Sequence, residues 1–370
     1  MKRVLVFLDN FDTGGVTSVV KSIYRNIDRE KFKMDFIRRN TNINDFDEEI
    51  RKNGDRVFYY NDYPLNKIPI LNYKIKETNQ SRQIIKELFS LRYDVIHIHA
   101  NPVLGLIVAK KMKIPVKVMH VHEAVSDFGG NEERSLITKL IWNQRQRLYN
   151  SVPTVKAGDS MRAVRVKFGD DVINDRSTTV IYPPVDMNKF NPNIYNGSTF
   201  DIDKESFNII HVGRLNAVKN QSFIIDVLEE LNKKKNASLY IIGEGPLKER
   251  LELYAKEKGI GAKLHFMPAD TSVEIYKFMN CSLLPSHSEA FGMVAVESQL
   301  MGVACFASTN VPDDVDIGMC EFLDLSLGAE EWAEKILSYD YSNSAIDEEK
   351  KSKFDIESII KQVEGLYEGI

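Results

Sequence analysis

The fold of this chain is decided by residues 281–302, which read CSLLPSHSEAFGMVAVESQLMG. The apolar run from Cys281 to Leu284 predicts a buried strand, and the spacing of the apolar residues that follow predicts a helix ending at Gly302. A strand, a polar turn and a helix in this order are typical of a βα unit in an α/β protein. Ligands of such proteins bind at the carboxyl ends of the strands, so the polar turn is a candidate binding loop.

Two glutamates in this unit have a spacing that suits a nucleotide-sugar. Glu289 lies in the turn, and Glu297 lies about two turns into the helix, at ~3.6 residues per turn. The N–H groups of Gly292, Met293 and Val294 would form an anion site at the start of the helix. The glutamates would then accept hydroxyl groups on either side of a diphosphate, as in a ligand made of hexose, diphosphate and ribose. The alternative is that Glu289 only interacts with the helix dipole and Glu297 is a solvated helix residue.

Length and composition indicate a globular protein of two domains. The chain has 370 residues, of which 43% are hydrophobic and 28% charged, and its net charge is −4. Residues 1–185 contain 31 Lys and Arg against 22 Asp and Glu, whereas residues 186–370 contain 18 against 31. The basic first half predicts either contact with an anionic partner, such as a membrane surface or a phosphate-bearing acceptor, or attraction between the two halves.

The cysteines and the apolar runs indicate a cytoplasmic protein. Cys281, Cys305 and Cys320 show no CxxC spacing and lie in or near apolar runs, as reduced core cysteines do. The first apolar run, from Val4 to Leu8, is too short for a signal sequence, and no run reaches the ~18 residues of a membrane-spanning helix. We expect a soluble protein, or one that rests peripherally on a membrane surface.

Predicted strands and helices alternate in both halves of the chain, as in a doubly wound sheet. In the first half the predicted strands are Val4–Leu8, Phe32–Ile37, Arg56–Tyr60, Asp94–His99, Pro115–His122, Thr154–Ala157 and Thr178–Ile181. The predicted helices there are Val16–Ile27, Gln83–Ser90, Leu104–Met112 and Ser135–Leu148. In the second half the predicted strands are Phe207–Val212, Ser238–Ile242, Lys263–Met267, Cys281–Leu284 and Cys305–Ala307. Its other predicted helices are Gln221–Lys233, Leu247–Lys258 and Val273–Met279.

Prolines mark the boundary between the two domains. The segment 182–192, YPPVDMNKFNP, can be neither a helix interior nor a central strand, and it reads as a linker. We therefore predict two Rossmann-like domains, over residues 1–185 and 186–345, that face each other across a cleft. Within residues 346–370, the tail has apolar residues on one helical face and predicts an amphipathic helix that packs back toward the N-terminal domain.

Arg214 and Lys219 follow the predicted strand Phe207–Val212 and so lie at the same end of the sheet as Glu289. A leaving phosphoryl group needs positive charge where negative charge develops, and an Arg fork with a Lys charge supplies it. The alternative is a pair of ordinary surface cations.

Two glycine-rich turns also follow predicted strands. Gly243-Glu244-Gly245 predicts a tight turn or a place where a ligand approaches the backbone. Gly14-Gly15 would let backbone N–H groups approach a phosphate, or would form a plain turn. The third glycine of a GxGxxG fingerprint is absent, which argues against an NAD-dependent oxidoreductase.

Four of the seven histidines form two His-x-His pairs, each at the end of a predicted strand: His97/His99 and His120/His122. Side chains alternate along a strand, so both rings of a pair should point to the same face. Four histidines on neighbouring strands could bind a metal, but Glu123 is the only acidic residue beside the pairs in the sequence. We favour polar residues that line a cleft, without a metal. Two further histidines inside apolar strands are interpreted as hydrogen-bonded core residues: His211 and His265.

Together these residues resemble the retaining, nucleotide-sugar-dependent glycosyltransferases of family 4, which have the two-domain GT-B fold. Glu289 and Glu297 match the Glu-x7-Glu motif of that family. The other matching segments are Gly213-Arg214 with Lys219-Asn220, Gly243-Glu244-Gly245, and the linker from Val185-Asp186 to Phe190. Two segments resemble the branch that makes bacterial capsular and exopolysaccharides: Val311–Asp316 and Glu331–Ala333.

The resemblance implies a role for each matching residue. Arg214 and Lys219 would hold the donor diphosphate, Glu289 would contact the donor-sugar hydroxyls, and Glu297 the ribose. His122 would be the cleft histidine near the reacting sugar. Further donor contacts would come from Gly243, Phe291, Gly292, Met293 and Val294. The acceptor side would include Gly14, Gly15, His99 and His120. Thr17 departs from the family pattern, which has an acidic residue there.

The implied activity is transfer of a hexose from a UDP-sugar to a saccharide or lipid-linked saccharide in cell-surface polysaccharide synthesis. The family retains anomeric configuration by a front-face displacement that needs neither a protein nucleophile nor a metal. No nucleic-acid partner is expected. Two alternatives stay open: a sugar-nucleotide epimerase or hydrolase on the same scaffold, and a non-catalytic partner subunit of a transferase. The subunit would be expected to lack the Glu pair or the Arg/Lys pair, and this chain has both.

Overall fold

The computed structural model describes residues 1–8, 15–39, 43–60, 87–100, 102–122, 136–195, 200–342 and 345–369. The chain forms two compact units. Unit 1 contains Met1–Pro184 together with Ile356–Ile370, and unit 2 contains Val185–Asp355. The chain therefore leaves unit 1 after a pair of prolines and returns to it for the last helix.

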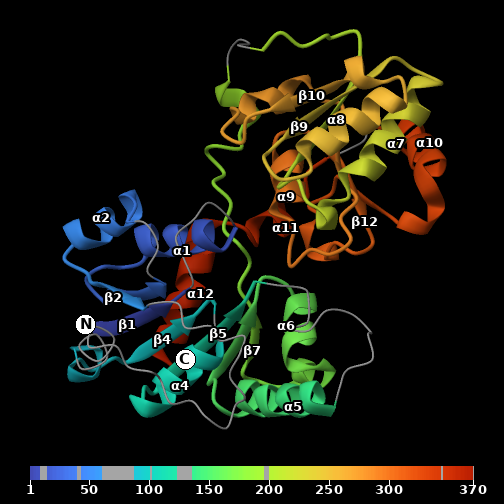
Figure 1. Cartoon of the computed structure of the whole chain (residues 1–370). Coiled ribbons are helices and arrows are strands. Elements are labelled where there is room, and N and C mark those ends of the chain that lie inside the picture. Colours follow the sequence, from blue (N-terminus) through green and yellow to red (C-terminus); the bar gives the residue numbers. More distant parts are fainter. Residues whose placement is uncertain are drawn as a thin grey trace. The chain divides into compact units, whose positions relative to one another are not determined.

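Unit 1 is built on a seven-stranded parallel sheet with the strand order β3-β2-β1-β4-β5-β6-β7 (Figure 1). The strands are β1 (Lys2–Phe7), β2 (Phe32–Arg39), β3 (Val57–Tyr60), β4 (Val95–Ile98), β5 (Val116–Val121), β6 (Val155–Gly158) and β7 (Thr178–Val180). The order of the strands reverses between β1 and β4. In doubly wound sheets this switch point, at the carboxyl ends of the strands, is where ligands bind.

Helices connect the strands of unit 1, and one of them is anchored by a buried ion pair. The helices are α1 (Gly15–Asn26), α2 (Asp45–Lys52), α4 (Pro102–Lys111), α5 (Leu136–Ser151), α6 (Met161–Phe168) and α12 (Ile356–Glu368). Asn44 caps α2 in a capping box with Asp47, whose carboxylate accepts from the Asn44 N–H. The same carboxylate lies 2.6 Å from Arg38 Nη2, and both side chains are completely buried.

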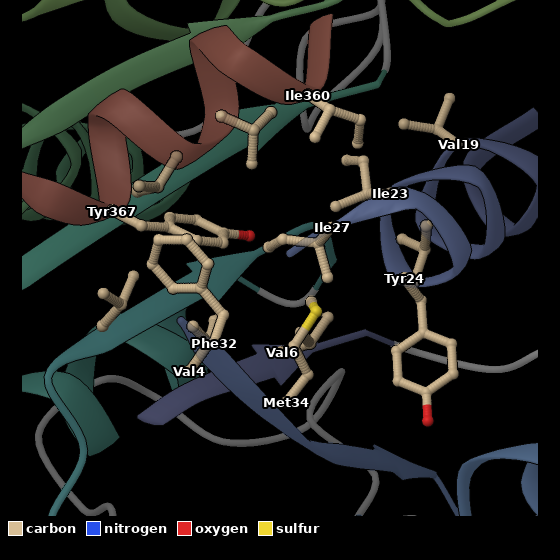
Figure 2. Close-up of a cluster of buried hydrophobic side chains, with 14 of the residues drawn as sticks. Val4, Val6, Val19, Ile23, Tyr24, Ile27, Phe32, Met34, Ile360 and Tyr367 are labelled. Carbon is tan, nitrogen blue, oxygen red and sulfur yellow. The ribbon is translucent and has the colours of Figure 1, made fainter. Parts of the chain in front are cut away.

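The C-terminal helix α12 completes the core of unit 1. Figure 2 shows Ile360 and Tyr367 of α12 directed toward apolar side chains of α1 and of the first two strands. The Tyr367 ring packs edge-on against Phe32, with 5.6 Å between ring centroids. Lys2 Nζ donates to the backbone carbonyls of Tyr367 and Glu368 at 3.0 Å each, so a positive charge meets the carboxyl end of the helix.

Unit 2 repeats the same topology with six parallel strands in the order β10-β9-β8-β11-β12-β13. The strands are β8 (Phe207–Val212), β9 (Ala237–Ile242), β10 (Leu264–Met267), β11 (Cys281–Leu284), β12 (Ala304–Ser308) and β13 (Cys320–Leu323). The helices are α7 (Gln221–Asn232), α8 (Lys248–Glu257), α9 (Met293–Leu300), α10 (Gly328–Ser338) and α11 (Glu348–Ser352). The switch point of unit 2 lies between β8 and β11.

The predicted fold class, two Rossmann-like α/β domains, is confirmed. The predicted helix Val273–Met279 is instead a 3₁₀ helix, Val273–Phe278. His265 was predicted in the core, and this is wrong: it lies on the edge strand β10, partly exposed and stacked on Tyr240 with 4.7 Å between ring centroids. Gly14 and Glu123 lie outside the described residues, as do the first four residues of the predicted helix Gln83–Ser90.

The cysteines lie in unit 2, and all three are free thiols. Cys281 and Cys305 are buried, whereas Cys320 is partly exposed. No helix in the described part of the chain is long and apolar enough to cross a membrane.

Candidate functional site

The switch point of unit 2 brings together two loops that the sequence marks as binding loops. The first loop follows β8 and carries Arg214 and Lys219, and the second follows β11 and carries Glu289. The backbone N–H of His287 donates to the carbonyl of Val218 at 2.8 Å, and Asn220 Nδ2 donates to the carbonyl of Pro285 at 3.2 Å. These bonds tie the two loops together and fix where their side chains meet.

Lys219 and Glu289 form an ion pair, with 2.6 Å between Nζ and Oε1. Ser286 Oγ donates to the same carboxylate oxygen at 2.6 Å, and the Ser286 carbonyl in turn accepts from Ser308 Oγ. The Lys219 and Glu289 side chains are 20% and 12% exposed, so the pair stays within reach of a ligand. Among the described residues, Oε2 of Glu289 has no partner, which leaves it able to accept a hydrogen bond.

The first loop is held from beneath by a buried histidine and a glutamine. His211 Nδ1 donates to the carbonyl of Leu283 at 2.8 Å, so its Nε2 accepts from Gln221 Nε2 at 3.2 Å. Burial lowers the pKa of His211 to about 4, so the ring is neutral, and the prediction of a hydrogen-bonded core histidine is confirmed. Gln221 also donates to the carbonyl of Arg214 at 2.9 Å. The Arg214 side chain is exposed, and within the described chain its guanidinium has no partner.

Gly243 is required because the backbone of the first loop passes directly over it. The residue has a φ of +146°, and a Cβ atom there would lie 2.1 Å from the carbonyl oxygen of Gly213. No side chain fits in this gap. The predicted tight turn is therefore a backbone contact between the loops that follow β8 and β9, and it places Gly243 next to the Arg214 loop.

Gly292 starts α9 in a left-handed conformation, with a φ of +105°. A Cβ atom at this position would meet Leu284 and Val311 side chains at 3.2 Å. None of the hydrogen bonds within the described residues uses the N–H groups of Gly292, Met293 or Val294, so these donors are available to an anion. Phe291, just before them, is buried against Phe354 with 5.5 Å between ring centroids.

Glu297 occupies an unusual environment for a carboxylate. Burial raises its pKa to about 7, and the positive charge of Lys189 offsets part of that rise. The hydroxyl of Tyr276 is buried and has no partner among the described residues, and the charge of Glu297 contributes to the raised pKa of that tyrosine. The Glu297 carboxylate and the unpaired Tyr276 hydroxyl thus lie near each other. This arrangement suits a ligand with hydroxyl groups.

Replacing Glu297 with glutamine should stabilise the ligand-free protein at high pH. In the folded chain Glu297 keeps its proton up to a pKa of about 7, against an ordinary value of 4.5. The wild type therefore loses stability as the pH rises from 4.5 through 7, because ionisation then requires a charge to be buried. At pH 8 we expect Glu297→Gln to be more stable by roughly 3 kcal/mol, since a pKa of about 7 against 4.5 is worth about 1.4 kcal/mol per pKa unit. Urea unfolding at pH 4, 6 and 8 measures the difference.

The control for this prediction is Glu252→Gln, which changes an exposed carboxylate of α8 in the same unit. This variant should unfold at the same urea concentration as the wild type at all three pH values. The prediction fails if the change in unfolding free energy caused by Glu297→Gln is no more stabilising at pH 8 than at pH 4.

Unit 1 gathers the two His-x-His pairs at the carboxyl ends of β4 and β5. The rings of His97 and His99 are 4.0 Å apart between centroids, and those of His120 and His122 are 4.2 Å apart, so the prediction of a common face within each pair is confirmed. Burial lowers the pKa of His97 and His99 well below the ordinary value and that of His120 to about 4. These rings are therefore neutral at pH 7.

Asp159, which was not among the predicted site residues, bridges the two rings of the second pair. His120 Nε2 lies 3.1 Å from Oδ1 of Asp159, and His122 Nδ1 lies 2.9 Å from Oδ2. Burial acts to raise the pKa of Asp159, but the interactions with His122 and His120 outweigh it and hold the value at about 2. A signal was present in the sequence, because Asp159 directly follows a strand, but its relevance depends on β6 lying next to β5.

A bound cation is a geometric alternative for part of this cluster. His97, His99 and His120 bring nitrogen atoms within 4.8 Å of one another, and so do the ligand atoms of His120, His122 and Asp159. In the second of these groups, Asp159 already bonds one nitrogen each of His120 and His122. Gly15, the other predicted residue of this region, begins α1 after β1 and is exposed.

Comparison with known proteins identifies related chains over nearly the whole length. Residues 13–189 match the family model "Glycosyltransferase Family 4", and residues 198–313 match "Glycosyl transferases group 1". The chain is 27% identical over 352 residues to EpsF of Bacillus subtilis (strain 168), a protein described as a glycosyltransferase. The alignment covers 90% of this chain and 87% of that protein.

Two solved structures share the fold. The Anabaena protein Alr3699/HepE, in complex with UDP and glucose, has a TM-score of 0.74 at 18% identity, with 100% of both chains covered. A glycosyltransferase from Rickettsia africae ESF-5 has a TM-score of 0.71 at 16% identity, and the comparison covers 100% of this chain and 98% of that one.

Proposed function

Because this chain belongs to the glycosyltransferases of family 4 and has the GT-B fold, we propose that it is a retaining hexosyltransferase. It uses a UDP-sugar as donor and a saccharide or lipid-linked saccharide as acceptor, in the cytoplasm, for a cell-surface polysaccharide. One observation carries this proposal: Lys219 and Glu289 meet at 2.6 Å at the switch point of unit 2, beside the exposed Arg214. EpsF and the HepE complex with UDP and glucose support it.

Each residue of the site binds a different part of the donor. Lys219 and Arg214 neutralise the diphosphate, and the free N–H groups at the start of α9 donate to its oxygens. Glu289 accepts from hydroxyls of the hexose through its unpartnered Oε2, and Glu297 accepts from the ribose. Because two cationic side chains and backbone N–H groups balance the phosphate charge, the reaction proceeds without a metal ion.

Transfer with retention then needs no nucleophile from the protein. The bond between the anomeric carbon and the diphosphate oxygen breaks, and the acceptor oxygen bonds to the same face of the sugar. The acceptor hydroxyl gives its proton to the leaving diphosphate, so the products are the glycoside and UDP. Lys219 and Arg214 stabilise the negative charge that develops on the leaving oxygen, which is where preorganised donors contribute most.

A thermal-shift panel with UDP, GDP, ADP and UDP-glucose, first without metal, tests the proposal. A ligand that binds only the folded state raises the melting temperature by mass action. We expect UDP and UDP-glucose to raise it without metal, and the other two nucleotides to raise it less. No shift with any nucleotide would contradict the donor class. A shift that requires added divalent metal would contradict the proposal that Lys219 and Arg214 bind the diphosphate without a metal ion. In a separate assay, consumption of UDP-glucose with no acceptor would instead indicate an epimerase or hydrolase.

A further inference from the structure

The histidine cluster of unit 1 brings one nitrogen of each of three buried rings close together. His97, His99 and His120 each offer a ligand atom within 4.8 Å of the other two, and all three residues are buried. His97 and His99 come from β4 and its end, and His120 comes from β5, the next strand of the sheet. Zn²⁺ is bound by three histidines in this way, with its fourth tetrahedral position left for water.

The distance between two of these nitrogens suits a shared metal ion. His97 Nε2 lies 3.3 Å from His120 Nδ1, which is at the long end for a hydrogen bond. The same cluster contains a bond of ordinary length, 2.8 Å between His99 Nδ1 and His122 Nε2. Two nitrogens that each lie about 2.0–2.1 Å from a tetrahedral Zn²⁺ are about 3.3–3.4 Å apart. An ion between His97 and His120 therefore requires little movement of either ring.

The carboxylate of Asp159 leaves lone pairs on the inner nitrogens of two of the rings. A carboxylate only accepts, so His120 carries its proton on Nε2 and His122 carries its proton on Nδ1. His120 Nδ1 then has a lone pair. A neutral His122 accepts on Nε2 from His99 Nδ1, which leaves a lone pair on His99 Nε2. Within the described chain no hydrogen bond uses His99 Nε2, so this lone pair is available to an ion.

His97 can supply the third lone pair, because its outer nitrogen is bonded to a hydroxyl group. The distance between His97 Nδ1 and the Tyr367 hydroxyl is 2.7 Å. A tyrosine hydroxyl can donate or accept, so His97 can carry its proton on Nδ1 and keep a lone pair on Nε2. Metal-binding histidines are usually oriented by a bond from the ring nitrogen that does not bind the metal. Each ring of the set has such an outer partner: Tyr367 for His97, His122 for His99 and Asp159 for His120.

We propose that unit 1 binds one Zn²⁺ through Nε2 of His97, Nε2 of His99 and Nδ1 of His120. The sequence alone favoured a site without a metal, because a carboxylate beside the pairs was not evident. The structure supplies this carboxylate in Asp159, which orients His120 and does not bind the ion itself. The ion joins β4 to β5 and, through Tyr367, to α12, so it stabilises unit 1. It has no part in binding the diphosphate, which the proposed function assigns to unit 2.

The metal content of the full chain tests the site. The chain is stripped with EDTA, dialysed against a small excess of Zn²⁺, desalted and analysed by mass spectrometry of the metal. We expect one Zn²⁺ per chain, and a melting temperature that rises with Zn²⁺ but not with Mg²⁺ or Mn²⁺, which prefer oxygen ligands. Co²⁺ in place of Zn²⁺ should show the strong visible absorption of a tetrahedral ion. A folded wild-type chain that retains no Zn²⁺ would overturn the proposal.

Substitutions then test whether the three histidines hold the ion. His99→Gln should weaken Zn²⁺ binding by more than about 100-fold, because it removes a ligand, and Asp159→Asn by about 10–100-fold, because it removes an outer partner. The control is His265→Gln, which removes a partly exposed histidine of unit 2 and should bind one Zn²⁺ as tightly as the wild type. Circular dichroism checks that each variant is folded. Wild-type affinity in a folded His99→Gln chain would contradict the proposal.

The ligand atoms can be identified without any substitution that affects folding. Long-range ¹H–¹⁵N NMR correlation on the wild-type chain labelled with ¹⁵N-histidine reports which nitrogen of each ring carries a proton. In the zinc-loaded chain we expect His97 and His99 to be protonated on Nδ1, and His120 on Nε2. A proton on Nε2 of His97 or His99 would exclude that nitrogen as a ligand and overturn the proposal. Binding of UDP by the metal-free chain tests the donor site of unit 2, so either proposal can fail while the other stands.

Discussion

Replacing Lys219 with alanine should lower the turnover for sugar transfer by two or more orders of magnitude. The lysine ammonium is the charged donor that the first loop holds at the switch point, 2.6 Å from Glu289. Loss of one preorganised donor to a developing oxyanion costs about 10²–10³ in turnover in enzymes that depend on it. Arg214→Ala should act in the same direction. The measurement is the initial rate of UDP release with saturating donor and acceptor.

The control for Lys219→Ala is Lys234→Ala, which removes an exposed lysine of the same unit paired with Glu334. Turnover of this variant should equal that of the wild type. The fold of Lys219→Ala should also persist, because Glu289 keeps its hydrogen bond from Ser286. Activity of Lys219→Ala within tenfold of the wild type would refute the proposed role of Lys219 in stabilising the leaving diphosphate.

Replacing Asp47 with alanine should destabilise unit 1 by about 3–5 kcal/mol, because removal of one partner leaves the other charge buried and uncompensated. Arg38 and Asp47 are both completely enclosed, with Nη2 and Oδ2 2.6 Å apart. The substitution also removes half of the capping box of α2 and the acceptor of the Tyr59 hydroxyl. Equilibrium unfolding in urea, followed by circular dichroism, measures the loss.

A second substitution in α2 tests whether the loss of stability depends on burial of the ion pair rather than on removal of a charge. Glu49 also lies in α2 and also pairs with an arginine, with 2.6 Å between its Oε2 and Arg25 Nη2, but the pair is exposed. Solvent-exposed ion pairs contribute about 0–1 kcal/mol, so Glu49→Ala should unfold close to the wild type. Equal losses for the two variants would contradict the argument.

Alternation of strand and helix in the sequence was sufficient to predict the doubly wound fold. The unit from Cys281 to Gly302 contains β11 and α9 as expected, and the loops that carry Lys219 and Glu289 meet as their placement after strands indicated. Such predictions succeed because parallel strands are buried on both faces and read as continuous apolar runs. The roles of the individual site residues remain predictions.

Other elements were missed for identifiable physical reasons. Helix α2 has eight residues and two large apolar side chains, and its stability depends on the cap at Asn44 and the buried carboxylate of Asp47. Strand β13 is a four-residue edge strand, with little apolar periodicity to detect. The role of Asp159 could not be read from the sequence, because it depends on the order of strands in the sheet, which a single chain does not reveal.

The return of α12 to unit 1 has a consequence for how the protein is made on the ribosome. Unit 2 is one continuous segment, and all of it has been synthesised before α12. The core of unit 1, by contrast, stays open on the face that Ile360 and Tyr367 cover until those residues emerge. Domains fold as units during synthesis, so the unit that begins the chain is the last to close. Until then its apolar face is exposed to chaperones, and His97 lacks its hydrogen bond with the Tyr367 hydroxyl.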